Sequence, residues 1–497
     1  MLILLSILFP IICGIVLWYR LRGSGRDGNT LYKAVILIAD ALALLAAFAG
    51  RPVTLFSLSP RVTFSFSVDI ISIWFLIAAL VLYTCTLFYS LVYMKIKERV
   101  HSFLMFYLIS FGALIAVCFS ANMITIYFAF ELTTLSTVPL VLHDRTKTAV
   151  AAGMKFLFYS IGGALLGLFG VFFLYAYAGE DVSFIAGGVL DAAKTAGHEP
   201  MLYLAVFLGV IGYGTKAGMF PMHGWLPTAH PIAPAPASAL LSGIITKSGV
   251  LVIIRFIYYS IGTDLIRGSW MQYAWLTLAL ITVLMGSTMA FLEHNLKTRL
   301  AYSSISQISY IMLGLALLSQ GGLDGGLLQV MQHAPSKACL FLCAGAFIYR
   351  YGLHDVRDLK GIGKKMPVTL WCLTLAAMSL VGIPPMGGFV SKWYLVAASF
   401  RAPLGAISVI GPAVLLFSAL LTAGYLFPIM IDGFFPGKDA PEVKDKYPEL
   451  APHTSPGRKR RETVPALMWI PLIALCVLSL IIGIFGSSLM SLFQGIV

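Results

Sequence analysis

The chain has 497 residues, of which 59% are hydrophobic and only 11% are charged. Soluble domains carry about 25% charged residues, so this composition, with repeated apolar runs of about 20 residues, predicts an all-α polytopic membrane protein. The runs are continuous and do not alternate with a period of two, which argues against a transmembrane β-barrel. The net charge of +13 is spread over short loops, so it indicates membrane topology rather than a nucleic-acid-binding face.

Fourteen apolar runs follow one another, and we expect each to cross the membrane. They cover about residues 2–19, 32–48, 68–94, 102–118, 120–142, 154–178, 202–222, 236–260, 270–292, 299–318, 325–349, 367–400, 405–433 and 466–493. A straight helix over 367–400 would reach about 50 Å, well beyond a hydrocarbon core of about 30 Å. The segment GIPPMGG (382–388) is predicted to break it, because proline removes a helix donor and clashes with the preceding turn.

Basic residues are unevenly shared between the loops. Loops after the odd-numbered runs hold most of the 34 Lys and Arg residues, Lys297 and Arg299 among them. Loops after the even-numbered runs hold only Arg51, Arg61, Lys194, Arg267 and Arg401. We expect a prokaryotic-type cytoplasmic membrane, and the positive-inside rule predicts that the odd-run loops lie in the cytoplasm and both termini outside. The longest cytoplasmic loop, 434–465, is predicted to be a solvated topology anchor, with contact to anionic lipid or a partner as the alternative.

Six basic residues remain inside the runs, namely Lys155, Lys216, Lys247, Arg255, Lys337 and Lys392. A charge at bilayer depth costs about 2.5–3.5 kcal/mol on insertion scales, so it faces the protein interior or water and indicates a functional site. Lys155 lies at the edge of its run, where it can snorkel to the headgroups, and Arg255 can either snorkel or pair. The other four lysines are the primary site candidates.

Glu131 lies in the middle of its run and is the natural partner for Lys216, because charges inside a membrane usually pair. His333 lies four residues before Lys337, so the two share a helix face, and a neutral histidine can accept and pass on a proton. His223 and His230 lie in a Pro/Ala/His-rich joint. For these three histidines a proton relay and a structural role remain equally open. The alternative for the whole set is a group of static bridges that hold the bundle together.

Two runs are broken beside a lysine. Run 202–222 carries Lys216 with Pro221, and run 367–400 carries Pro384 and Pro385 with Lys392. They lie five runs apart, and an odd offset reverses their direction across the membrane. The expected organisation is therefore helices 1–3 in residues 1–101, inverted five-helix repeats in 102–260 and 270–433 with broken helices 7 and 12, the loop 434–465, and a last helix in 466–497. Many transporters have inverted repeats, with midplane sites at discontinuous helices.

Five segments of the chain resemble a known family. They are FELTTLSTVPL around Glu131, the stretch from Lys216 to Arg255, HNLKTRLAYSSISQISYIMLG (294–314), HAPSKACLFLCAGA (333–346) and GIPPMGGFVSKWYL (382–395). Over about residues 120–400 the chain resembles the antiporter-like subunits of respiratory complex I and of Mrp sodium/proton antiporters.

The resemblance implies fourteen helices, two inverted repeats and proton movement along a central polar axis. It matches the family's functional positions to Glu131, Lys216, Lys247, His333, Lys337 and Lys392. Lysine at 392, where one complex I subunit type has glutamate, is more similar to the Mrp D type and to its relatives in membrane-bound hydrogenases and ferredoxin- or F420-linked complexes.

The chain shows no GxGxxG after a strand, no P-loop and no C-x-x-C among its seven cysteines. We therefore expect no cofactor in this chain, and any iron–sulfur clusters, flavin or nickel–iron centre in partner membrane subunits. The predicted function is the proton-translocating subunit of a complex I-like or Mrp-type energy-converting complex, with sodium as a further candidate ion. A stand-alone cation/proton antiporter and a purely structural scaffold are the alternatives.

Overall fold

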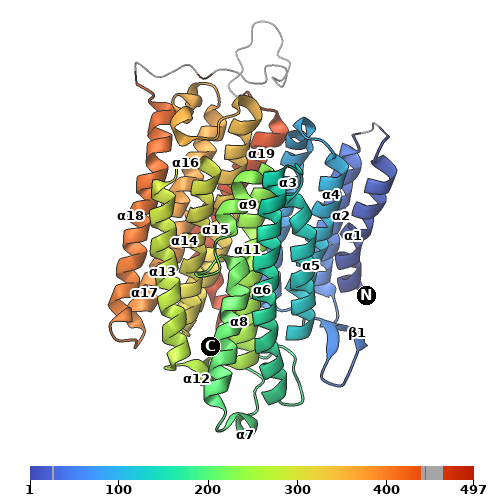
Figure 1. The fold of residues 1–497 in the computed structure, drawn as a ribbon, viewed down its shortest axis with the longest axis vertical. Coiled ribbons are helices and arrows are strands. Elements are labelled where there is room, and N and C mark those ends of the chain that lie inside the picture. The colour runs from blue at the N-terminus through green and yellow to red at the C-terminus, as the bar shows by residue number, and fades with distance from the viewer. Residues whose placement is uncertain (25–26, 438–442, 444–462, 497) are drawn as a thin grey trace.

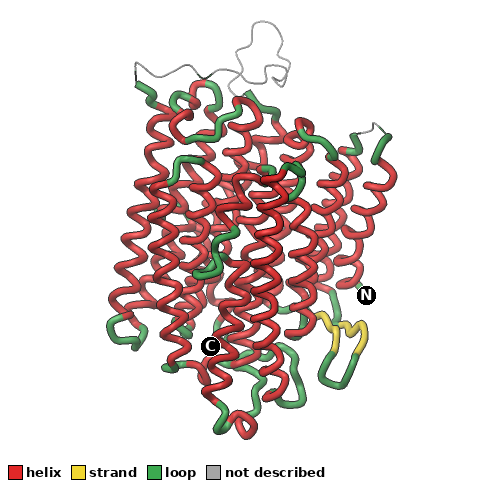
Figure 2. The backbone as a smooth tube through the Cα atoms, in the orientation of Figure 1, coloured by secondary structure: helices red, strands yellow, loops and turns green. Residues whose placement is uncertain are grey.

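The computed structural model describes residues 1–24, 27–437, 443 and 463–496, so most of the predicted anchor 434–465 lies outside the described residues. The described part is a bundle of helices with one small β-hairpin (Figures 1 and 2). The main elements are α1 (Leu2–Leu21), α2 (Asn29–Ala49), β1 (Val53–Ser57), β2 (Thr63–Phe66), α3 (Ile70–Tyr93), η1 (Met94–Ile96), α4 (Val100–Phe119), α5 (Met123–Val141), α6 (Lys147–Tyr177), α7 (Ala192–Thr195), α8 (Glu199–Ala217), α9 (Leu226–Ile232), α10 (Ala235–Leu240), η2 (Leu241–Ile245), α11 (Thr246–Phe256), η3 (Ile257–Ile261), α12 (Thr263–Ile266), α13 (Trp270–Leu292), α14 (Leu296–Ala316), α15 (Gln320–Tyr351), α16 (Pro367–Val381), α17 (Gly387–Arg401), α18 (Ile407–Phe434), α19 (Ala466–Leu489) and η7 (Met490–Phe493).

Within the described residues, 11 helical segments are long and apolar enough to cross a membrane. They are α1, α2, α3 with η1, α4, α5, α6, α8, α10 through η3, α13, α18, and α19 with η7. Their number and apolar character confirm a polytopic helical membrane protein. The remaining long helices, α14 and α15, carry more polar residues and run inside the bundle, where α15 is buried along almost its whole length. Buried helices can carry polar side chains because they do not face lipid.

The expectation of a purely helical chain is wrong at one place. Strands β1 and β2 form an antiparallel hairpin with Val53 opposite Phe66 and Ser57 opposite Thr63. Its residues are mostly β-branched or aromatic, which suits a pleated ribbon, and the rings of Phe56 and Phe64 stack across it with centroids 4.4 Å apart. Apolar composition over so short a segment does not distinguish a strand from a loop between two spans.

Both predicted helix breaks are present. Helix α8 ends at Ala217, five residues before the predicted end of its run, because Gly218 takes the left-handed conformation (φ 82°) that closes many helices. The chain then turns before α9 and α10 begin. In the second half, α16 ends at Val381 and α17 begins at Gly387, so the break falls on the predicted GIPPMGG segment. Each break leaves backbone carbonyl groups inside the bundle that need donors.

Candidate ion-translocation site

Lys216 lies in the last turn of α8 and is 1% exposed. Its Nζ donates to the carbonyl oxygen of Phe130 at 2.9 Å and to Oγ1 of Thr134 at 2.7 Å, both on α5. The Phe130 ring adds a cation–π contact at 3.9 Å. The ammonium group is therefore held by helix α5, without a direct carboxylate partner among the described residues.

Glu131 follows Phe130 on α5, but it forms no ion pair with Lys216 in the described part of the chain, although the two interact electrostatically. Its carboxylate lines a cavity of about 580 Å³ between α1, the hairpin and α5, and its Oε1 has no hydrogen-bond partner among the described residues. The predicted pair is therefore close but separated. The Phe130 carbonyl and the Thr134 hydroxyl accept the hydrogen bonds of Lys216 instead.

Lys247 is fully buried on α11, directly after the π-helical turn η2. Its Nζ donates to the carbonyl of Ser242 in that turn, and Thr246 Oγ1 lies 3.5 Å away. Two residues on, Gly249 lets α11 approach α8 closely, since a Cβ there would lie 2.7 Å from the Tyr213 carbonyl oxygen and 3.4 Å from Cβ of Lys216. π-helical turns often occur at functional sites.

Lys297 is a further buried lysine, although the sequence predicts it in a cytoplasmic loop. Helix α14 begins at Leu296, so Lys297 lies in its first turn and is only 4% exposed. Its Nζ donates to the carbonyls of Pro231, at 3.2 Å, and Ala233 at the end of α9. The missed signal is Asn295, whose side chain accepts from the Thr298 amide and so marks an earlier helix start.

His230 and His333 are both fully buried, and neither ring nitrogen of either residue has a hydrogen-bond partner in the described chain. The His230 ring stacks on Phe341 with centroids 4.7 Å apart. His230 interacts electrostatically with Lys297, Lys337 and Lys247, and His333 does so with Lys247, Lys337 and Lys392. The two rings therefore lie near lysines of both halves of the chain.

Lys337 is fully buried on α15, one turn after His333. Its Nζ donates to the Leu300 carbonyl at 3.1 Å and to Oγ of Ser303, both on α14. Lys392 on α17 donates to the carbonyls of Leu380 at 2.5 Å and Val381 at 2.8 Å, at the broken end of α16. Both ammonium groups are thus held by backbone and hydroxyl oxygens, as Lys216 is.

A cluster of uncharged polar side chains lies beside Lys392. Gln329 donates to Gln307 at 3.0 Å and accepts from Gln332 at 2.8 Å and from Ser391 at 2.6 Å. All four are fully buried. We call Gln307, Gln329, Gln332 and Ser391 the amide cluster. Such groups can donate and accept hydrogen bonds at once.

A cavity of about 1110 Å³ lies beyond the amide cluster, at the end of the bundle predicted to face outside. Ala398 of α17 and Asp324 of α15 line it, and Asp324 is the one buried carboxylate in the described chain. Leu395 is fully buried between Ser391 and Ala398, about one turn from each on α17. It fills a gap between helices, because a Cβ at Gly325 would lie 2.9 Å from its Cδ2. Leu395 thus lies on α17 between a residue of the amide cluster and a residue of the cavity lining.

Arg255, Lys155 and His223 have other partners than the four central lysines Lys216, Lys247, Lys337 and Lys392, which we call the lysine row. Arg255 pairs with Asp69 through two hydrogen bonds of 2.6 Å and stacks on Tyr259, so pairing and not snorkelling is observed. Lys155 donates to Thr228 at 3.0 Å beside the first break. His223 lies at the same break and stacks on Phe220. Among the described residues, no group of three or more His, Cys, Asp or Glu is placed to hold a metal ion.

Comparison with known proteins decides the family. The family model described as "NADH:quinone oxidoreductase/Mrp antiporter, TM" matches residues 120–419. The chain belongs to this family. It is 33% identical over 396 residues to NADH-quinone oxidoreductase subunit N of Desulforudis audaxviator, covering 78% of this chain and 75% of that one. It is 32% identical to hydrogenase-4 component B of Escherichia coli, covering 69% of this chain and 52% of the relative.

Two solved structures share this fold. A chain of the Mrp complex from Dietzia sp. superposes with a TM-score of 0.80 at 23% identity, covering 98% of this chain and 95% of that one. A chain of an archaeal membrane-bound sulfane sulfur reductase gives a TM-score of 0.81 at 21% identity, covering 99% and 96%. The likeness extends over the whole chain, beyond the segments that carry the sequence resemblance.

Proposed function

We propose that this chain is the proton-translocating, antiporter-like subunit of a larger energy-converting membrane complex. The observation that carries the proposal is a set of four lysines, the buried Lys216, Lys247 and Lys337 and the half-buried Lys392. Each is held by neutral oxygens and not by a carboxylate of the described chain. A buried ammonium group without a counter-ion is costly. Because no carboxylate holds these ammonium groups, each can release a proton without breaking a salt bridge.

Glu131 controls the first step in this mechanism. When its carboxylate turns towards Lys216, it stabilises the ammonium form, since an opposite charge nearby favours the charged state. When it turns back to the cavity beside α1, Lys216 loses that support and passes its proton to Lys247. The close α8–α11 contact at Gly249 supports this transfer. His230, His333 and water then connect Lys247 to the second half.

The proton leaves from the second half in the same scheme. It passes from Lys337 to Lys392, and from there through the amide cluster towards the outer cavity or to a neighbouring protein of the complex. Leu395 closes the way to the cavity at rest. Asp324, buried at the cavity wall and hydrogen-bonded to Gln320 at 2.8 Å, is the proposed proton acceptor at this cavity.

The proposed architecture is fourteen spans with inverted repeats in 102–260 and 270–433. Its support is the 11 apolar spans, the internal helices α14 and α15, and the broken pair α16–α17. Each break lies beside a lysine of the row. Both chain ends lie in the lower half of Figure 1, as an even number of spans requires. We place the protein in a cytoplasmic membrane with this end outside.

Other membrane subunits are the proposed partners. The fold neighbours are chains of multi-subunit complexes. One relative, 31% identical over 362 residues that cover 69% of this chain and 43% of the relative, belongs to a Na⁺/H⁺ antiporter of Alkalihalophilus pseudofirmus. We assign electron carriers, where the complex has them, to these partners. Protons are the main proposed ion, with sodium as a coupled ion.

The experiment uses membrane vesicles that contain the intact complex. In Lys216→Ala and Glu131→Ala variants we expect driven proton uptake to fall to background while the complex still assembles. Lys216→Arg, which keeps a charge but cannot be deprotonated, should fail in the same way. Full pumping in both alanine variants would overturn the proposal.

A further inference from the structure

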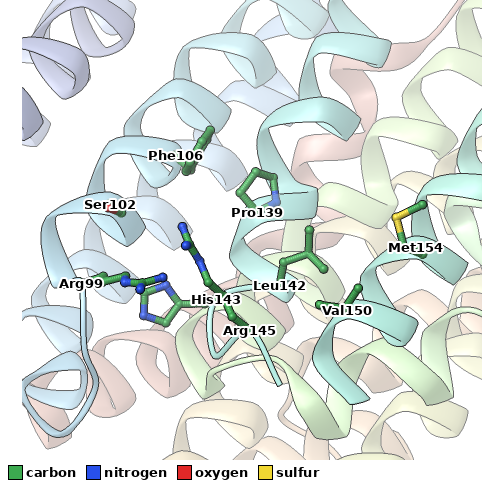
Figure 3. Close-up of a pocket in the computed structure, with 9 residues that line it drawn as sticks. All are labelled: Arg99, Ser102, Phe106, Pro139, Leu142, His143, Arg145, Val150 and Met154. Carbon is green, nitrogen blue, oxygen red and sulfur yellow. The ribbon is translucent and has the colours of Figure 1, made fainter. Parts of the chain in front are cut away.

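A smaller cavity, of about 340 Å³, lies at the predicted cytoplasmic end of the bundle and away from the lysine row. The start of α4, the end of α5 and the start of α6 surround it (Figure 3). Its lining is Arg99, Ser102, Phe106, Pro139, Leu142, His143, Arg145, Val150 and Met154. The proposed translocation route does not use this site.

Two arginines converge on this cavity from opposite sides. In Figure 3 the Arg145 side chain rises between Phe106 and Pro139, and the Arg99 guanidinium lies beside His143. Among the described residues, neither arginine forms an ion pair with a carboxylate, and no carboxylate lines the cavity. The nearby acid Asp144 is already paired with Lys97 at 2.5 Å. Two uncompensated guanidinium groups are thus left facing one space.

The backbone holds both arginines in an unusual conformation. Arg99 has a φ of 56° and Arg145 a φ of 51°, and only one other non-glycine residue in the described chain, Leu318, has a positive φ. This region is unfavourable for side chains larger than glycine. Strained residues tend to occur at ligand clamps, where the surrounding structure holds them in place.

The other polar groups of the cavity are uncharged, and one of them, Ser102, supplies a donor. Ser102 Oγ accepts from Nε1 of Trp18 at 3.2 Å, so its own proton remains free to donate. His143 Nε2 lies 2.9 Å from the Glu98 carbonyl, which can only accept, so the imidazole proton is on Nε2. Burial lowers the pKa of His143, and its ring is therefore neutral near pH 7. The positive charge of the site comes from the two arginines.

The rest of the lining is apolar and continues onto the outer surface of the bundle. Phe106, Pro139 and Leu142 form the wall, and Val150 and Met154 of α6 are 45% and 38% exposed. An acyl chain can lie along this strip while its headgroup stays beside the arginines. A soluble anion has no apolar part that could bind to this strip.

We propose that this cavity binds the phosphate headgroup of an anionic phospholipid, with Arg99 and Arg145 on the phosphate, Ser102 as an additional donor and one acyl chain along Val150 and Met154. Guanidinium groups bind phosphate oxygens in pairs of parallel hydrogen bonds. Basic pockets between membrane helices on the cytoplasmic side bind such headgroups. Free phosphate shares the headgroup chemistry, and the experiment separates the two.

The test is native mass spectrometry of the detergent-purified complex after titration with phosphatidylglycerol. In the double variant R99Q/R145Q we expect the occupancy of one tight lipid site to fall by at least about tenfold, the loss expected from removing two charge-assisted contacts. K147Q is the matched control, because Lys147 is a nearby exposed cation that does not line the cavity. Its lipid occupancy should equal that of the unaltered complex.

Two further measurements sharpen the result. Met154→Asp should weaken phosphatidylglycerol binding while both arginines remain, because it places a charge against the acyl chain. Inorganic phosphate at millimolar concentration should leave the bound lipid in place. Unchanged lipid occupancy in R99Q/R145Q would overturn the proposal. Displacement of the lipid by phosphate alone would identify a soluble-phosphate site and overturn it as well.

Discussion

Each lysine of the candidate site lies within hydrogen-bond distance of two carbonyl or hydroxyl oxygens of the described chain. Lys216 uses a carbonyl and a hydroxyl of α5, and Lys392 uses the carbonyls that α16 leaves free at its broken end. Neutral oxygens stabilise an ammonium ion less than a carboxylate does. Each lysine therefore lacks the stabilisation that a salt bridge would give its charged form.

Lys297 provides a test of this view at a residue that the sequence placed in a loop. Lys297→Met keeps the length of the side chain but leaves the carbonyls of Pro231 and Ala233 without their donor. Each buried acceptor without a donor costs about 1–3 kcal/mol, so the melting temperature of the complex should fall. Lys360→Met, at a loop position, is the control and should leave it unchanged. Equal melting curves for both variants would show that the hydrogen bonds from Lys297 to the end of α9 do not stabilise the fold.

Arg255 is the contrasting case, because its guanidinium group forms an ion pair with the carboxylate of Asp69. We expect Arg255→Met to lower the free energy of unfolding by about 1–3 kcal/mol, since it removes a bidentate, partly buried contact. Arg255→Met with Asp69→Asn should recover part of that loss. Both variants should pump protons at normal rates per assembled complex. A selective loss of pumping in a stable variant would instead place Arg255 on the proton route.

At the scale of elements, the sequence predicted the breaks better than the ends of helices. The prolines and glycines at 382–388 directly disfavour a continuous helix, so the local sequence is enough to predict this break. The end of α8 at Ala217 depends on Gly218 taking a left-handed conformation, and the sequence does not indicate which of its many glycines does so. The β-hairpin was missed for a related reason, because its stability depends on packing and on Asn122, which donates to the Thr63 carbonyl at 2.9 Å.

The contact between α8 and α11 yields a prediction about an element. Gly249→Ala places a Cβ 2.7 Å from the Tyr213 carbonyl oxygen, so α11 must move away from α8. Overpacking of this kind costs about 1–3 kcal/mol. We expect lower thermal stability and, in the assembled complex, slower proton transfer between Lys216 and Lys247. Gly162→Ala on α6 is the control, because nothing described lies within 4 Å of its new Cβ. If both variants melt and pump alike, the close contact is not required.

At the scale of the whole molecule, the sequence identified the lysines but not their connections. Depth in an apolar run was enough to single out Lys337 and Lys392, because a charge at that depth demands an explanation. Contacts between helices that are far apart in sequence depend on the tertiary fold. The bridge from Asp69 to Arg255 and the cluster around Gln329 therefore became visible only in the folded chain.

The route across the second half gives the last prediction, and it rests on Leu395. Leu395→Ser replaces the apolar barrier between the amide cluster and the outer cavity with a small hydroxyl, which admits water. In liposomes with an imposed pH gradient we expect a proton leak through the complex that needs no driving reaction. Leu395→Met conserves volume, so liposomes that contain this variant should not leak protons. Adding Lys392→Ala to Leu395→Ser should stop the leak, because the last lysine of the proposed route is then missing. A leak that persists without Lys392 would mean that protons reach the outer cavity by another path, and tight vesicles in Leu395→Ser would mean that this cavity is not the exit.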